Sequence, residues 1–428
     1  MRFSRRHLLL GSLAAASVGA QARAAEDRSQ ELQALIDRAA RSGAPLTLPP
    51  GTFRARDLVL RSGARIDARP GATRIVFGGG DALITAHDAA GVSLSGLTLD
   101  GGGLTIAGNG GLVRMSQAER LLVSGCTIAN VKGNALSLTR CGGIVGDNTI
   151  TDAADTALFS LDSRLLMRGN AIARSGNGGI RVWRSVKQSD GSVIEDNTIA
   201  DTQARGGGDG QNGNAINVFR AADVTVRGNT IRNAAFTAVR GNAASRIKII
   251  GNTCFALGEV AIYSEFEFED AIIADNLIDV AAVGIAVTNM DRGGHGAVVR
   301  NNTIRNMVNK RPQGGPDSHG VGIGVEADTE VTGNTVENAL VMGIEVGSGK
   351  YLRNVTVTKN VLRKTGIGIG VTVVEGAGSA TITDNVIADA KDGAVVGMRW
   401  DKPATGDLTK SGGAAFAHLR IAGNQVNR

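Results

Sequence analysis

The sequence is poor in aromatic residues, cysteine and proline. Aromatic residues make up 3% of its 428 residues, and there are 3 cysteines and 7 prolines. Three cysteines cannot build the disulfide framework of a small secreted protein, so we expect Cys126, Cys141 and Cys254 to be buried free thiols. No P-loop, zinc-ligand spacing or serine triad is present, which argues against those classes of enzyme. After the first 24 residues, no apolar run is long enough to span a bilayer.

The basic charge of the chain is concentrated at its N-terminus. The formal net charge is +6, but residues 1–24 contain four arginines and no acidic residue. The remaining chain therefore carries a net charge of only about +2, too little to indicate nucleic-acid binding. We expect no nucleic-acid partner.

Residues 1–24 have the pattern of a cleavable export signal. A basic start is followed by an apolar run from Leu8 to Ala20 and by the small-residue ending Ala-Arg-Ala. The pair Arg5-Arg6 before the leucines is typical of the twin-arginine export route. We therefore predict a periplasmic or secreted protein that is carried by the twin-arginine machinery and makes no membrane contact after cleavage.

An asparagine recurs through most of the remaining chain. It follows Gly, Asp, Asn or Lys and precedes a short β-branched segment, as in DNTI and GNTI. In two weaker early copies its place is taken by Cys126 and Leu97. The asparagines at this position are Asn148, Asn170, Asn197, Asn229, Asn252, Asn276, Asn302, Asn334, Asn360, Asn385 and Asn424.

Each repeat contains three short strand signals. Around Asn229 they are residues 215–219, 223–228 and 229–233, each with alternating β-branched residues. One repeat cannot bury its own apolar side, so neighbouring repeats must stack. Three parallel strands per repeat predict an all-β, right-handed parallel β-helix, in which the asparagines form a buried hydrogen-bonded ladder.

A single domain over residues 25–428 follows from this pattern. In residues 28–43 the apolar positions share one helical face, and Gly43 suits a helix C-cap. We expect this helix to cover the open end of the coil, which otherwise presents unpaired strand edges. The coils then occupy residues 46–428.

The helix, the segment LPPGTF (48–53) and the asparagine-bearing repeats together resemble the pectate-lyase-like β-helix superfamily. The combination with a twin-arginine signal is similar to exported bacterial β-helix repeat proteins of uncharacterised activity. The superfamily includes pectate lyases, polygalacturonases and alginate-modifying enzymes, so the resemblance implies a ligand groove along one strand face. The paired-Asp and Asn-Thr-Asp motifs of polygalacturonases and the Asp-Pro-His signature of alginate epimerases are absent.

One strand of each repeat reads G-I-x-V-x, and its two x residues are expected to point outward. Adjacent repeats then place these residues in two columns, and three insertions (201–214, 305–320 and about 400–416) adjoin the same strand. Aromatic faces stack on sugars, and arginine pairs with carboxylates. We predict that an acidic polysaccharide binds Arg181, Trp183, Asn217, Phe219, Tyr263 and Glu345; packing of the aromatic residues under loops is the alternative.

Several residues of the same strip are candidates for chemistry. Arg240 could be a lyase-like base, Glu265 or Glu326 an acid or base, and His319, in the insertion that enters the strand, could titrate near neutral pH. Glu265 and Glu267 lie in an acidic segment and could hold Ca²⁺, a hard cation that takes oxygen ligands.

Three functions remain open at this stage. The first is a lyase or epimerase acting on a uronate-containing glycan, and the second is a non-catalytic glycan-binding or envelope-structural protein. The third is a periplasmic accessory protein that carries a metal or cofactor. The chain has no covering helix at its C-terminal end, so either the segment 400–416 folds under the last coil or the protein self-associates there.

Overall fold

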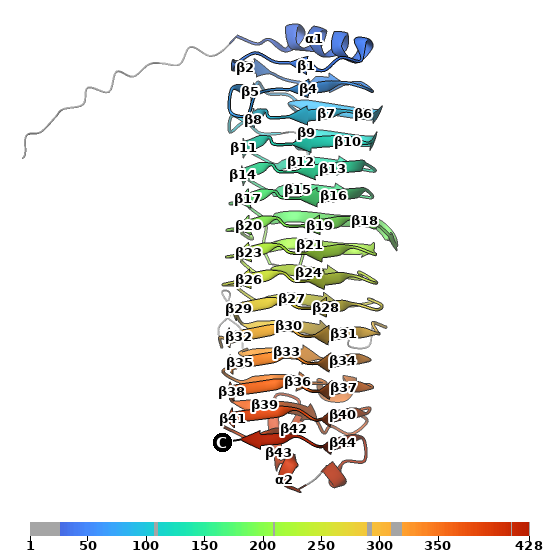
Figure 1. Cartoon of the computed structure of the whole chain (residues 1–428), viewed down its shortest axis with the longest axis vertical. Helices are drawn as coiled ribbons and strands as arrows, with labels where there is room; N and C mark the ends of the chain where they lie inside the picture. The colour runs from blue at the N-terminus through green and yellow to red at the C-terminus, as the bar shows by residue number, and fades with distance from the viewer. Residues whose placement is uncertain are drawn as a thin grey trace, which may run out of the picture.

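The computed structural model describes residues 26–106, 110–208, 210–288, 293–309, 319–411 and 413–427. The predicted export signal, residues 1–24, lies outside these ranges, as do residues 310–318 of the second insertion. The described strands follow one another in a three-part cycle and build three long sheets, each of 15 strands (Figure 1). All pairings are parallel except that of the last strand of the third sheet. The predicted parallel β-helix is confirmed.

The three sheets run the length of the molecule. Sheet 1 comprises β1 (Leu46–Thr47), β4 (Arg65–Asp67), β7 (Ser93–Ser95), β10 (Leu121–Ser124), β13 (Gly142–Gly146), β16 (Arg164–Arg168), β19 (Val193–Glu195), β22 (Thr225–Arg227), β25 (Lys248–Ile250), β28 (Ile272–Ala274), β31 (Ala297–Arg300), β34 (Thr329–Thr332), β37 (Val355–Thr358), β40 (Ala380–Thr383) and β44 (Leu419–Ala422).

Sheet 2 comprises β2 (Gly51–Ala55), β5 (Thr73–Phe77), β8 (Thr98–Asp100), β11 (Thr127–Val131), β14 (Thr149–Ala153), β17 (Ala171–Ala173), β20 (Thr198–Ala200), β23 (Thr230–Arg232), β26 (Thr253–Phe255), β29 (Leu277–Ala281), β32 (Thr303–Met307), β35 (Thr335–Ala339), β38 (Val361–Thr365), β41 (Val386–Ala390) and β45 (Gln425–Asn427).

Sheet 3 contains the predicted groove strand of every repeat. It comprises β3 (Leu58–Leu60), β6 (Ile84–Ala90), β9 (Gly111–Glu119), β12 (Asn134–Thr139), β15 (Thr156–Leu161), β18 (Gly178–Ser189), β21 (Asn214–Ala222), β24 (Val239–Asn242), β27 (Val260–Glu265), β30 (Val283–Thr288), β33 (Val321–Val325), β36 (Met342–Val346), β39 (Ile367–Thr372), β42 (Val395–Arg399) and β43 (Lys402–Asp407).

The recurrent asparagines form the predicted ladder at the turn between sheets 1 and 2. The side chain of Asn229 donates to Oδ1 of Asn252 (2.9 Å) and to the carbonyl of Ile194 (3.0 Å), while its backbone N–H also donates to Oδ1 of Asn252 (3.0 Å). The same contacts recur along the ladder to Asn424. The residue before each asparagine has a left-handed backbone, as at Gly228 (φ 64°) and Asp275 (φ 58°), which explains the preference for Gly, Asp and Asn there.

The interior of the coil is a continuous column of Ile, Val and Leu side chains. Cys254 takes the place of an isoleucine in this column, since it pairs in register with Ile231 and Ile278. All three cysteines are buried and free, as predicted. Burial raises the pKa of Cys126 to about 11 and that of Cys254 to about 12, so both thiols stay protonated and unreactive at neutral pH.

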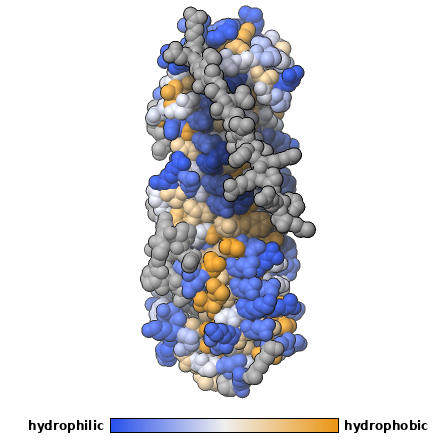
Figure 2. Space-filling view, turned by 90° about the vertical axis from the view of Figure 1, so that its left-hand side faces the viewer, coloured by the Kyte–Doolittle hydropathy of each residue, from blue (hydrophilic) through white to orange (hydrophobic). Residues whose placement is uncertain are grey.

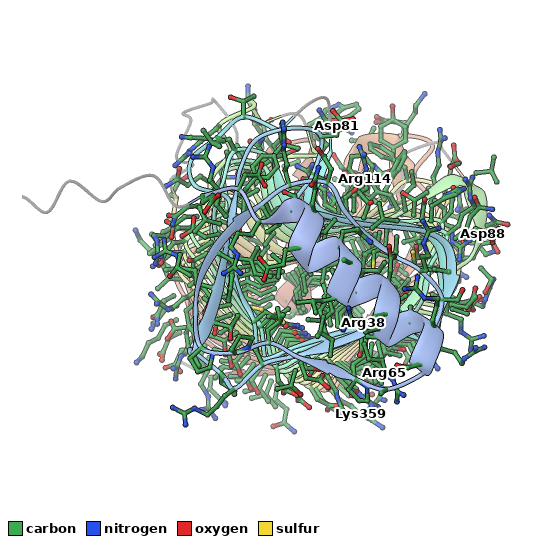
Figure 3. All side chains as sticks on the ribbon, turned by 90° about the horizontal axis from the view of Figure 1, so that it is seen from above. Arg38, Arg65, Asp81, Asp88, Arg114 and Lys359 are labelled. Carbon is green, nitrogen blue, oxygen red and sulfur yellow. The ribbon has the colours of Figure 1, made fainter. Side chains whose placement is uncertain are left out.

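Both ends of the coil are covered. Helix α1 (Ser29–Ser42) lies across the N-terminal end, buries Leu32, Ile36 and Ala39, and ends at the left-handed Gly43 (Figure 3). At the other end β43 turns back antiparallel to β42, and α2 (Leu408–Ser411) buries Leu408 in the core. The segment 400–416 therefore folds under the last coil, one of the two predicted alternatives, and self-association stays a prediction.

Two 3₁₀ turns complete the described elements: η1 (Gly349–Tyr351) and η2 (Gly413–Ala415). None of the helices in the described ranges has the length and apolarity that a membrane crossing needs.

Replacing one interior ladder residue tests how strongly the coil depends on it. We expect Asn252→Ala to lower the free energy of unfolding by about 2–4 kcal/mol, because it leaves buried donors of Asn229 without an acceptor. Asn424→Ala is the matched control in the last coil, where the side chain is only partly buried and water reaches the vacated position, and should cost about 1 kcal/mol. Chemical denaturation followed by circular dichroism measures both. An equal loss in the two variants would contradict the buried-ladder explanation.

Candidate functional site

The outward residues of sheet 3 form the two predicted columns. Register pairs place Phe159, Arg181, Asn217, Arg240 and Tyr263 side by side on β15, β18, β21, β24 and β27. The second column, two positions along each strand, contains Leu161, Trp183, Phe219, Asn242 and Glu265. Neighbouring residues of a column are about 4.8 Å apart because the strands are paired.

The aromatic residues of the upper columns contact one another. Trp183 packs edge-on against Phe159 (centroids 5.4 Å apart) and against Phe219 (5.7 Å). Its indole N–H donates to Oδ1 of Asn217 (2.8 Å), and Nδ2 of Asn217 donates to the carbonyl of Gly210 in the first insertion (3.1 Å). Trp183 is thus held in one orientation while staying partly exposed.

Arg240 and Glu265 form a bidentate ion pair on adjacent strands. The guanidinium donates to both carboxylate oxygens (2.7 and 2.8 Å), and Nδ2 of Asn242 donates to the first of them (2.7 Å). The ring of Tyr263 lies against the guanidinium (5.0 Å to the centroid). The Glu265 side chain is only 1% exposed, so it orients Arg240 and has no open face toward a ligand.

Arg181 anchors the first insertion to the sheet. It is buried, donates to Oδ1 of Asn212 (2.8 Å), lies 3.5 Å from Asp155 and stacks over Trp183 (5.4 Å to the centroid). Burial lowers the pKa of Arg181, and the charge of Asp155 opposes that shift. The contacts of Arg181 are therefore within the protein, whereas the sequence analysis predicts that this residue binds the polysaccharide.

An upper cavity of about 270 Å³ opens between the first insertion and sheet 3. On its outer side, the extended end of β18 reaches across two coils: Nζ of Lys187 donates to the carbonyl of Glu267 and lies 3.8 Å from the carboxylate of Glu269. The cavity is lined by Trp183, Gly210, Gln211, Asn217, Phe219, Arg240, Asn242 and Phe266.

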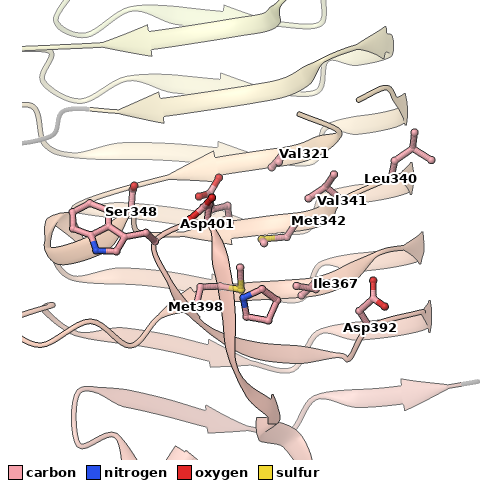
Figure 4. A pocket seen from close by; sticks show the side chains of 12 residues that line it. Val321, Leu340, Val341, Met342, Ser348, Ile367, Asp392, Met398 and Asp401 are labelled. Atoms are coloured by element: carbon pink, nitrogen blue, oxygen red, sulfur yellow. The ribbon is translucent and has the colours of Figure 1, made fainter. Parts of the chain in front are cut away.

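A larger lower cavity, of about 660 Å³, lies on the same sheet nearer the C-terminus. Its floor is apolar, with Met342, Ile367 and Met398 side by side (Figure 4). Its one acidic residue from the strands of sheet 3 is Glu345. Burial, followed by the negative charge of Glu326, raises the pKa of Glu345 to about 7. The cavity is lined by Val321, Leu340, Val341, Met342, Glu345, Ser348, Ile367, Asp392, Met398, Trp400, Asp401 and Pro403.

The predicted site residues therefore divide between two places. Trp183, Asn217, Phe219 and Arg240 line the upper cavity, and Tyr263 and Glu265 support Arg240. Glu345 lines the lower cavity, and Glu326 lies close enough to act on its charge. His319 is buried before β33 and lines neither cavity.

The two predicted calcium ligands are not brought together with others. Both carboxylate oxygens of Glu265 accept from Arg240, and Glu267 is exposed at a left-handed position next to Lys187. In the described ranges, no three His, Cys, Asp or Glu side chains converge as metal ligands would.

Sequence reasoning missed the lower cavity. Met342 and Met398 occupy outward positions that look like core residues in the repeat pattern, and Trp400 lies in the third insertion. The one available signal was that the second tryptophan of the chain directly follows a groove strand.

The fold and the two cavities define a parallel β-helix with ligand-sized hollows along one sheet. A model described as right-handed β-helix region matches residues 84–210. A second model, of the family described as periplasmic copper-binding protein (NosD), matches residues 203–417, half of the chain. The chain belongs to this family. No curated protein matches its sequence.

Several solved structures are similar to the chain at low identity. A mannuronic-acid-specific family 6 polysaccharide lyase from human gut microbiota is 14% identical, with 93% of this chain and 90% of that chain covered and a TM-score of 0.50. The catalytic unit of a GH87 α-1,3-glucanase from Streptomyces thermodiastaticus is 16% identical (89% and 69% covered, TM-score 0.47). A tailspike of E. coli bacteriophage HK620 in complex with a pentasaccharide is 12% identical (93% and 75%, TM-score 0.49). The likeness to the polysaccharide lyase shows the fold alone.

The family description raises the question of copper. Copper sites in proteins use thiolate, thioether and imidazole ligands. In the described part of the chain the three thiols are buried separately in the core, and the methionines of the lower cavity, Met342 and Met398, pack with Val321, Ile367 and Val396. No three described His, Cys, Asp or Glu side chains converge either, so the described thiols, thioethers and imidazoles do not fit a resident copper ion.

The raised pKa of Glu345 predicts a pH-dependent stability. Because the folded-state pKa (about 7) exceeds the ordinary value of 4.5, the folded protein binds more protons between these values and loses stability as pH rises through them. We expect the free energy of unfolding to fall by roughly 2–3 kcal/mol between pH 4.5 and 8, and the variant Glu345→Gln to abolish this fall. Asp223 and Glu375, with pKa values lowered to about 2, titrate below this window.

Denaturant unfolding of the wild type and of Glu345→Gln at pH 5 and pH 8 measures the difference. Glu330→Gln, on the exposed face of sheet 1, is the matched control and should behave as the wild type does. A wild-type curve that parallels that of Glu345→Gln across this range would refute the assignment.

Proposed function

We propose that this protein is an exported glycan-binding β-helix protein, and that an acidic polysaccharide binds across the upper cavity of sheet 3. The observation that carries the proposal is that Trp183, Phe219 and Arg240 line one cavity. The aromatic faces offer stacking surface for sugar rings. The guanidinium uses Nε and one N–H of Nη2 on Glu265, and its remaining N–H groups can donate to a uronate carboxylate.

The surroundings of the cavity also favour an anionic chain. Arg220 lies over the ring of Phe219 (4.8 Å to the centroid) and is exposed. Glu265 offsets the charge of Arg240 but fixes its planar fork, so less side-chain entropy is lost when a carboxylate binds. Long-range attraction then comes from Arg220, since Lys187 is already paired with Glu269.

Binding is better supported than β-elimination or epimerisation at this cavity. A lyase-like base must accept a proton, and Arg240 would have to leave Glu265 to do so. Glu265 itself is occupied by Arg240 and Asn242. Modification of the glycan stays the second function, and release of unsaturated uronate from alginate or pectate, followed by ultraviolet absorbance, would establish it.

Loss of the stacking surface should weaken binding. We expect Trp183→Ala to lower affinity for polygalacturonate or alginate about fivefold to thirtyfold, measured by calorimetry, because a stacking contact contributes about 1–2 kcal/mol. Phe255→Ala, an outward aromatic residue of sheet 2, is the matched control and should leave affinity unchanged. Equal affinity of the wild type and Trp183→Ala would contradict the proposal.

The charge at the cavity should select for acidic glycans. The double variant Arg240→Gln/Glu265→Gln removes both charges without leaving a buried carboxylate unpaired. We expect it to reduce affinity for polygalacturonate about tenfold while any binding of a neutral glucan stays as in the wild type. The same loss for both polymers would show that Arg240 has only a structural role.

The predicted export route also belongs to this proposal. We expect Arg5→Lys/Arg6→Lys to leave the precursor in the cytoplasm, because the twin-arginine pair is the feature that this route reads. Cell fractionation measures the outcome, and Arg2→Lys, outside the pair, is the matched control. Normal export of the double variant would point to a different route.

A further inference from the structure

The lower cavity differs in chemistry from the upper one. Its floor is formed by Val321, Met342, Ile367 and Met398, which pack with Val396 in an apolar cluster on the outer face of sheet 3, separate from the interior core. Figure 4 shows Met342, Ile367 and Met398 beside one another on this floor, with Leu340 and Asp392 toward one end and Ser348 and Asp401 toward the other. Leu340 is 63% exposed, and hydrophobic surface also gathers in the lower half of the face in Figure 2.

The charged groups that line this cavity are all acidic. They are Glu345 on the floor and Asp392 and Asp401 at the rim, and none of the three forms an ion pair with a described residue. Arg399, next to the cavity, is held by both oxygens of Glu375 (2.8 and 2.6 Å), and Lys402 is exposed on β43. Burial and the nearby charge of Glu326 already raise the pKa of Glu345, so the protein does not compensate this carboxylate itself.

Trp400 is placed at this cavity at a conformational cost. It occupies the two-residue turn between β42 and β43 with a left-handed backbone (φ 56°), where Gly and Asn are favoured and a bulky residue is strained. Its ring packs on Gly349, where a Cβ atom would lie 2.3 Å from the indole. The residue is nevertheless 54% exposed. A strained, oriented and exposed aromatic residue beside a cavity is a feature of ligand sites.

We propose that the lower cavity binds a small organic cation with an apolar body, of the quaternary ammonium or protonated amine class. The indole of Trp400 attracts a cation to its face, and Glu345, Asp392 and Asp401 supply the countercharge. The apolar floor takes the hydrocarbon part, and about 660 Å³ is within the usual range of small-molecule sites. The inference is independent of glycan binding, which uses a different cavity.

A neutral sugar fits this cavity less well. Its hydroxyl groups would lose water against Met342, Ile367 and Met398, which offer no conventional hydrogen-bond partner in return. An anionic ligand would meet three carboxylates at short range. A cation with an apolar body satisfies both the floor and the rim.

Calorimetric titration of the mature protein with benzyltrimethylammonium tests this inference. Benzyl alcohol and benzoate serve as the neutral and anionic probes of similar shape. We expect saturable binding of the cation at least about tenfold tighter than that of either control probe, as cation–π and charge pairing together provide. Binding of benzyl alcohol as tight as that of the cation, or no saturable binding of the cation, would overturn the proposal.

Two variants locate the site. Trp400→Asn removes the indole but suits the left-handed turn, so the hairpin is retained, and Glu345→Gln removes the floor charge with little change of shape. Each should weaken binding of benzyltrimethylammonium about fivefold to thirtyfold. Glu330→Gln on sheet 1 is the control and should bind as the wild type does. Unchanged affinity in both Trp400→Asn and Glu345→Gln would show that the cation binds elsewhere and refute the assignment.

Discussion

The rest of the structure depends on the pairing of each coil with the next. Every described strand between the ends lies between two parallel neighbours except β42, whose neighbour β43 is antiparallel. The buried amide of each ladder asparagine bonds to the asparagine of the following coil as well as to backbone carbonyls. A coil shifted by one residue would lose that amide contact and turn its inward isoleucines to solvent. Register is therefore specified twice in each coil, by the ladder and by the apolar column.

This double specification is what makes an outward column possible on sheet 3. Because Ile216 and Val218 are locked inward, Asn217 and Phe219 must point outward, next to Arg181 and Trp183 on the preceding strand. The coils themselves offer few groups for binding or catalysis, because their interior is apolar and the ladder asparagines at their turns hydrogen-bond to the next coil. The insertions that wall the cavities leave the coil at strand ends, where added residues do not disturb the ladder.

The same logic explains how much the sequence could predict. The ladder positions, the three sheets and the two outward columns follow from local periodicity, because each depends only on residues one repeat apart. The roles of Glu265 and Arg181 do not follow from this periodicity. The repeat pattern places both side chains outward, where they could bind a ligand or take part in catalysis. In the structure Glu265 accepts hydrogen bonds from Arg240 and Asn242, and Arg181 donates to Asn212 in the insertion. Such contacts depend on side-chain geometry and on the path of a loop, neither of which a repeat pattern contains.

The lower cavity shows more clearly what a repeat pattern cannot predict. Repeat periodicity treats Met342 and Ile367 as further apolar residues of a β-helix, and only the return of β43 and the turn at Trp400 make them the floor of a hollow. That return is specified by a short segment outside the repeat. The pairing between coils must be kept for the chain to fold, whereas outward residues and insertions can change without disturbing that pairing. Membership of this fold or family therefore constrains the identity of the ligand only weakly. Two cavities lined by different charged residues on one sheet are a direct consequence, since Arg240 and Glu345 occupy the same column four strands apart and neither affects the ladder that holds both.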